Sequence, residues 1–175
     1  FTEQMLTERP GSETINIASA VKRLIVNVTR NWSKNSILWN YAADPQFDPH
    51  TDNGGCSMCQ GAITIDGDKV TRNIAYYTIA HASKFIRPGS VRISSTDAFD
   101  PGVDITEDEE RAEIRRATVV EHSDVLPNVA FKTPEGKIVL VIANDSWSQQ
   151  TAKIQYNGRF ANLHLAPGSV GTFIW

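Results

Sequence analysis

The stretch HASKFIRPGSVRI, residues 81–93, separates two parts of the chain that have different hydrophobic periodicities. Before Pro88-Gly89 the apolar residues recur every three or four positions, as they do on one face of a helix. After Gly89 they alternate with polar residues, as they do in a half-buried strand. Because Pro and Gly in succession end a helix, the sequence predicts a domain boundary near residues 88–90.

The first part, residues 1–88, is predicted to contain helices and parallel strands. Residues 13–31 and 71–85 have apolar residues at helical spacing, and His81 lies on the apolar stripe of the second helix, where a hydrogen-bonded structural role is favoured over a ligand role. Short strands are expected at residues 37–42 and 62–65, the second of them ending in a hairpin turn at Asp66-Gly67. Two strands and two helices cannot close a barrel, so this part is expected to be an incomplete set of β/α units.

The second part, residues 89–175, is predicted to be an antiparallel β-sandwich. Short runs of alternating or β-branched residues are separated by turn sequences such as Asn157-Gly158 and Pro167-Gly168. Residues 97–124 interrupt this pattern with a charged segment, EDEERAEIRR at its centre, which is expected to be a solvated helix or excursion.

Composition excludes several classes of partner. The 175 residues are 41% hydrophobic and carry a net charge of -3, which is typical of a globular protein and offers no basic footprint for nucleic acid. The longest apolar runs are too short to span a bilayer, so no transmembrane segment is expected. The chain opens with Phe1 and shows no signal-peptide pattern, which says little about export.

A long loop follows the strand at residues 37–42. Residues 36–59 read SILWNYAADPQFDPHTDNGGCSMC, and loops of more than about a dozen residues usually bind or catalyse, or are disordered. Trp39, at the mouth of the strand, could stack on a flat-faced ligand such as a sugar or could belong to the core. If the first residues of the chain and residues 37–42 are neighbouring parallel strands, Glu3 and Trp39 both emerge at the C-terminal rim, where barrel enzymes keep their sites.

Cys56 and Cys59 form a CxxC pair that admits several interpretations. A zinc site needs further ligands, and His50 is the one nearby candidate. A redox pair would precede a helix, whereas the following GAITID indicates a strand. Two thiols or a local disulfide are therefore favoured, and neither a metal nor a cofactor is expected.

Several segments resemble the C-terminal part of glycoside hydrolase family 30, the glucosylceramidase-like retaining β-glycosidases. They are FTEQ, NWSKNSILWNYAADP, HASKFIRPGS, NVAFKTPEGKIVLVIANDSW and APGSVGTFIW. The resemblance implies the last portion of a (β/α)8 TIM barrel followed by an antiparallel β-sandwich side domain. It also implies a role in carbohydrate or sphingolipid metabolism and an extracellular or periplasmic location.

The resemblance also implies roles for individual residues. Glu3 corresponds to the catalytic nucleophile at the end of the seventh barrel strand, and the acid/base carboxyl belongs after the fourth strand, upstream of Phe1. The implied substrate-binding residues lie on the eighth strand and in the loop after it: Trp39, Asn40, His50, Asp52 and Cys56.

The sequence therefore predicts a retaining β-glycoside hydrolase of the β-glucosidase or glucosylceramidase type, present as a C-terminal fragment that is inactive alone. Its expected partners are a β-linked glycoside and the remainder of the barrel. The alternative is a noncatalytic β-sandwich module that binds carbohydrate or serves as a structural domain, with the helical part as a docking layer. A redox or metal protein built on Cys56 and Cys59 is a third possibility.

Overall fold

The computed structural model describes residues 1–2, 4–6, 16–95 and 126–175. Glu3 and the charged segment at residues 97–124 lie outside the described residues. Across the described part of the chain, no helix is long and apolar enough to cross a membrane.

The chain begins with two short parallel strands, β1 (Gln4–Met5) and β2 (Leu38–Trp39). Gln4 pairs with Leu38 and Met5 with Trp39, so the two strands are parallel neighbours. A helical segment connects them, formed by α1 (Ile17–Val21), the π-helix η1 (Lys22–Asn27) and α2 (Val28–Arg30). This confirms the helix predicted at residues 13–31 as far as the chain is described.

A second small sheet joins β3 (Ala42–Ala43), β4 (Ile63–Asp66) and β5 (Lys69–Arg72) in that order. Helix α3 (Ile74–Ser83) follows it. The prediction that this helix starts at residue 71 is wrong, because residues 69–72 pair antiparallel with β4. The side-chain Nδ2 of Asn73 donates to the Gly61 carbonyl at 2.9 Å and to Thr64 Oγ1 at 2.8 Å, which fixes the junction between strand and helix.

The second half of the chain forms two antiparallel layers, as predicted. A four-stranded sheet has the order β11-β8-β7-β6, and a two-stranded ribbon pairs β9 with β10. The strands are β6 (Val91–Ile93), β7 (Asn128–Lys132), β8 (Ile138–Ala143), β9 (Gln150–Tyr156), β10 (Arg159–Leu165) and β11 (Val170–Ile174). Both Asn157 and Gly158 have positive φ angles, of 48° and 75°, as expected for the tight turn between β9 and β10.

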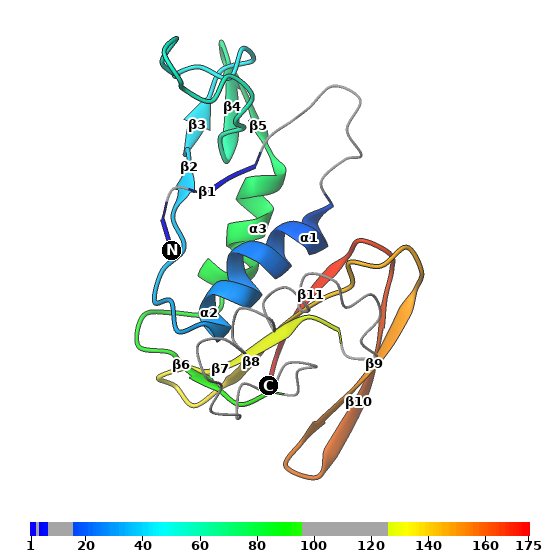
Figure 1. Cartoon of the computed structure of the whole chain (residues 1–175). Helices are drawn as coiled ribbons and strands as arrows, with labels where there is room; N and C mark the ends of the chain where they lie inside the picture. Colours follow the sequence, from blue (N-terminus) through cyan, green and yellow to red (C-terminus); the bar gives the residue numbers. More distant parts are fainter. Residues whose placement is uncertain (3, 7–15, 96–125) are drawn as a thin grey trace, which may run out of the picture.

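The four-stranded sheet is covered on both faces, and Figure 1 shows it with the helices on one side and the β9–β10 ribbon running alongside. Side chains alternate along a strand, so one set on β7 and β8 faces the helices while the other faces the ribbon. The helix-facing core comprises Val21, Ile25, Val26, Val129, Phe131 and Val141. The ribbon-facing core comprises Ala130, Leu140, Ile142 and Leu165, with Ala152 and Ile154 against it. The expected β-sandwich is thus confirmed.

The helices also carry a second apolar face, which packs on the strands at the start of the chain. Leu6, Ala20, Leu24 and Ala75 are buried there, with Leu38, Ala62 and Ile74 around them. The helical layer therefore joins the short parallel strands to the sandwich (Figure 1). Since helices and sheet share a core, the division into domains at residues 88–90 stays a prediction.

Candidate functional site

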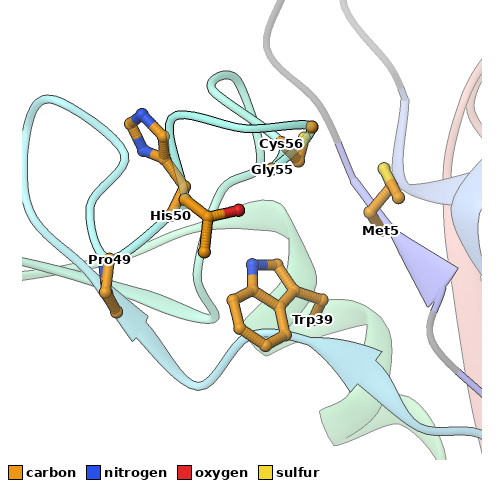
Figure 2. A pocket seen from close by; sticks show the side chains of 8 residues that line it. Met5, Trp39, Pro49, His50, Gly55 and Cys56 are labelled. Carbon is orange, nitrogen blue, oxygen red and sulfur yellow. The ribbon is translucent and has the colours of Figure 1, made fainter.

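A cavity of about 480 Å³ lies where β1, β2 and the long loop meet (Figure 2). Its wall is formed by Met5, Trp39, Pro49, His50, Thr51, Gly54, Gly55 and Cys56. Three of the residues predicted from the sequence, Trp39, His50 and Cys56, therefore share one wall. The cavity sits at the C-terminal end of the two parallel strands, since Met5 and Trp39 are their last residues.

Trp39 provides an aromatic surface in this wall. Its register partner on β1 is Met5, and the two residues are 42% and 38% exposed. Figure 2 shows the indole across the cavity from Gly55 and Cys56. Because the neighbouring residues Leu6 and Leu38 pack against the helices, Trp39 faces away from the core that the described residues form.

Asn40 lies beside the cavity without lining it. Its backbone carbonyl accepts a hydrogen bond from the Ala62 amide at 2.9 Å, which links the end of β2 to the segment before β4. Its side-chain Oδ1 is buried and accepts no hydrogen bond from the described residues. A buried acceptor without a partner is costly, so this oxygen is available to a donor that the described residues do not supply.

His50 contributes to the wall, but its ring is engaged by the loop. His50 Nδ1 lies 2.9 Å from Asp48 Oδ1 and 3.3 Å from the Phe47 carbonyl oxygen. Figure 2 shows the imidazole directed away from Trp39. Asp44 organises the same turn, since its Oδ1 accepts from the backbone amide of Asp48 at 2.9 Å. The ring of His50 therefore holds the loop in shape.

Asp52 is exposed and does not line the cavity, so the structure does not bring it together with Trp39. No carboxylate belongs to the wall formed by the described residues. The described wall can therefore stack on a ligand and shape its surroundings, but acid, base or nucleophilic chemistry requires carboxyl groups from elsewhere.

The two cysteines form a disulfide, Cys56–Cys59, with Cα atoms 5.5 Å apart. The interpretation as a local disulfide is confirmed, and neither sulfur is a free thiol. Cys59 is fully buried, and its Sγ lies 3.3 Å from Met5 Sδ. The Gln60 amide donates to the Leu6 carbonyl at 2.9 Å. The disulfide thus fastens the cavity loop to β1. Within the described ranges there is no cluster of three or more His, Cys, Asp or Glu side chains suited to a metal.

Sequence reasoning missed several wall residues: Met5, Pro49, Thr51, Gly54 and Gly55. The Gly54-Gly55 pair was the available signal. A Cβ on Gly55 would lie 2.4 Å from the Thr51 carbonyl oxygen and 2.5 Å from its backbone nitrogen, so the loop can close only with glycine there.

His81 lies outside this site. Its Nδ1 is 2.9 Å from Thr172 Oγ1 on β11, and burial lowers the pKa of the imidazole. The predicted structural role of His81, as a hydrogen-bonded contact between α3 and the sandwich, is confirmed.

The sequence is similar to known glycoside hydrolases. The family model of the glycosyl hydrolase family 30 β-sandwich domain matches residues 115–173. An endo-1,6-β-D-glucanase of Aspergillus fumigatus is 36% identical over 70 residues, which are 40% of this chain and 14% of the relative. An endo-1,6-β-D-glucanase of Trichoderma harzianum is 31% identical over 100 residues, which are 56% of this chain and 20% of the relative.

Two solved structures share the fold over the whole chain. An endo-β1,6-glucanase superposes with a TM-score of 0.73 at 24% identity, and SrfJ from Salmonella typhimurium with a TM-score of 0.72 at 21% identity. Each superposition includes 100% of this chain and 34% of the other chain. The chain therefore spans about a third of these structures and a smaller share of the curated relatives. These findings confirm the resemblance to glycoside hydrolase family 30, with the match to its β-sandwich domain falling on residues 115–173.

Proposed function

We propose that the chain is the C-terminal part of a retaining β-glycoside hydrolase, with the last units of a TIM barrel at residues 1–88 and the side domain at residues 89–175. The observation that carries this proposal is the cavity at the C-terminal ends of two parallel strands, with an exposed Trp39 in its wall. Barrel enzymes keep their active sites at this end of the strands.

The uncovered face of the two strands supports a barrel that continues beyond them. Leu6 and Leu38 point to the helices, whereas Met5, Trp39 and Ile37 are 38%, 42% and 53% exposed. Apolar side chains in a row on one face of a parallel pair require cover by further strands. The remainder of the barrel is therefore the proposed partner of this face.

Glu3 is the proposed nucleophile. It lies outside the described residues, and the support comes from its place in the sequence, directly before β1 and two residues before Met5.

The proposed reaction needs a second carboxyl group. In a retaining enzyme the nucleophile attacks the anomeric carbon as the glycosidic bond breaks, and an acid about 5 to 5.5 Å away protonates the leaving oxygen. The same group then removes a proton from water as water releases the sugar from the nucleophile. Since no described carboxylate lines the cavity, the acid/base is expected upstream of Phe1, and residues 1–175 alone are expected to be inactive.

The proposed substrate is a β-1,6-linked glucan, because two curated relatives and one solved structure are named endo-1,6-β-glucanases. Trp39 would stack on a glucosyl unit, and Asn40, His50 and Cys56 belong to the proposed surroundings of that unit. Glucosylceramide, the substrate type implied by the sequence resemblance, is the alternative. The Cys56–Cys59 disulfide supports an extracellular or periplasmic location, because disulfides persist in oxidising compartments.

The test is hydrolysis by the intact protein, including any residues that precede Phe1. We expect release of reducing ends from a β-1,6-glucan and no hydrolysis of glucosylceramide. Glu3→Gln should lower the rate by about three orders of magnitude or more, because the nucleophile is lost. Glu135→Gln, on the exposed turn between β7 and β8, is the matched control and should leave the rate unchanged.

Full activity of Glu3→Gln would refute the assigned nucleophile. Hydrolysis of glucosylceramide instead of the glucan would reverse the substrate assignment. Binding of glucan by the wild type without any hydrolysis would favour the noncatalytic β-sandwich module.

A further inference from the structure

The loop between β8 and β9 displays Trp147, which is 82% exposed. This loop does not line the cavity, and no described residue stacks on the indole. Leaving an indole in water forgoes the gain from burying its large apolar surface, so this ring has an apolar face available to a ligand.

The backbone on both sides of Trp147 is fixed by Asn144, which is fully buried. Its side-chain Nδ2 donates to the carbonyl oxygens of Ser148 at 2.8 Å and of Leu165 and Ala166 at 3.0 Å each. Its Oδ1 accepts from the Ser146 hydroxyl at 2.7 Å. The ring of Trp147 is therefore presented from a preorganised turn, which lowers the entropy cost of binding a ligand.

A second connection ties this loop to the helical layer. Lys22 Nζ, on η1, lies 2.7 Å from Asp145 Oδ2, and the side chains are 43% and 28% exposed. The loop thus has contacts with the helices on one side and with the β10–β11 connection on the other, and Trp147 projects from between these anchors.

The other tryptophans of the chain differ from Trp147. Trp32 is 79% exposed, but the Arg92 guanidinium lies over its ring at 4.5 Å. Trp175 has Tyr156 against its ring at 5.7 Å, and Trp39 belongs to the cavity. Trp147 therefore combines high exposure with a ring that no described side chain covers.

We propose that Trp147 is a second carbohydrate-binding site, at which the indole stacks on a glucose unit of a β-glucan chain outside the Trp39 cavity. An aromatic ring offers an apolar face to the C–H face of a sugar, and the exposed side chains of Ser148 and Gln149 offer polar groups to its hydroxyls. The ligand class rests on the proposed function. The site would retain a polymeric substrate without taking part in bond cleavage.

The test compares polymer binding with hydrolysis in the intact protein. Trp147→Ala should raise the dissociation constant for a soluble β-1,6-glucan about tenfold, which corresponds to about 1.4 kcal/mol of binding free energy. Affinity electrophoresis measures this constant. Hydrolysis of a short β-1,6-linked gluco-oligosaccharide should be unchanged, because that ligand occupies the cavity alone. Trp147→Tyr should retain most of the affinity.

Trp32→Ala is the matched control, because that Trp is equally exposed but has one face covered by Arg92. It should leave glucan affinity unchanged. Thermal unfolding of each variant reports on folding independently of binding.

Unchanged glucan affinity in Trp147→Ala would overturn the proposal. So would a marked loss of thermal stability without a specific loss of affinity, because the ring would then pack against another part of the intact protein. Glucan binding that depends on Trp147 in a protein without hydrolytic activity would refute the proposed function and leave this inference standing. Normal Glu3-dependent hydrolysis with unchanged polymer affinity in Trp147→Ala would refute the second carbohydrate-binding site and leave the proposed function standing.

Discussion

Strands β2 and β8 are both apolar, yet their environments differ. Every residue of β8 is buried, because the helices cover one face of its sheet and the β9–β10 ribbon covers the other. On β2, Leu38 packs on the helices while Trp39 is 42% exposed and forms part of a cavity wall. The sandwich is thus closed around its own core, whereas the parallel strands keep one face open, and the candidate site lies on that open face.

Substitutions on β8 and β2 should affect different properties of the protein, stability in the first case and hydrolysis in the second. Ile142→Ala removes a buried side chain from β8 and should lower the free energy of unfolding by about 2 to 5 kcal/mol. Trp39→Ala should change the free energy of unfolding by no more than about 0.5 kcal/mol, but it should lower glucan hydrolysis by the intact protein about tenfold or more. Denaturant unfolding and initial rates measure the two effects.

Equal destabilisation of the protein by Trp39→Ala and Ile142→Ala would contradict the difference between β2 and β8. Trp39 would then contribute to a core completed by the rest of the intact protein, and its exposure in the described structure would have no functional meaning.

The disulfide at the cavity allows a sharper test, with a smaller expected effect. Cys56→Ala and Cys59→Ala both remove the bridge, and a short cross-link of this kind contributes about 2 kcal/mol to the free energy of unfolding. Cys59 is fully buried with its sulfur 3.3 Å from that of Met5, whereas Cys56 is only half-buried, so Cys59→Ala should be the more destabilising of the two. Both variants should raise KM for the glucan, because Cys56 in the cavity wall loses its covalent link to residue 59, which lies against Met5.

If KM stays at the wild-type value in both variants, the disulfide does not position the wall. Equal stabilities of the two variants would show that the Cys59–Met5 contact adds nothing to the bridge itself.

Most of the fold was predictable from local patterns. The strands of the sandwich follow from alternation and turn residues, whereas the boundary expected near residues 88–90 from the change of period stays a prediction. The start of α3 was mispredicted because Thr71 continues the helical pattern, whereas pairing of residues 69–72 with β4 and the Asn73 side-chain bonds decide its true start. Such pairing depends on contacts that hydrophobic period alone does not contain.

The candidate site was predictable only in part. Trp39, His50 and Cys56 were identified from residue type and loop length, and all three reach the cavity wall. Asp52 was grouped with them because it is close in sequence, but it is exposed and does not line the cavity, although the adjacent Thr51 does. Loop conformation depends on such side-chain to backbone hydrogen bonds, which sequence spacing does not specify.

The smallest expected effect concerns the contact between the open part and the closed sandwich. Burial lowers the pKa of His81, which lies on α3 and contacts Thr172 of β11. At pH values between this lowered pKa and the unfolded value of 6.5, the unfolded chain binds more protons than the folded chain. The stability contributed by neutral His81 is therefore present above pH 6.5 and is lost as the pH falls through this window.

His81→Gln should reduce the loss of unfolding free energy between about pH 7.5 and about pH 5, measured by denaturant unfolding. An identical pH dependence in wild type and variant would show that the contact between α3 and the sandwich tolerates a charged imidazole, and the two parts would then be joined more loosely than their shared core indicates.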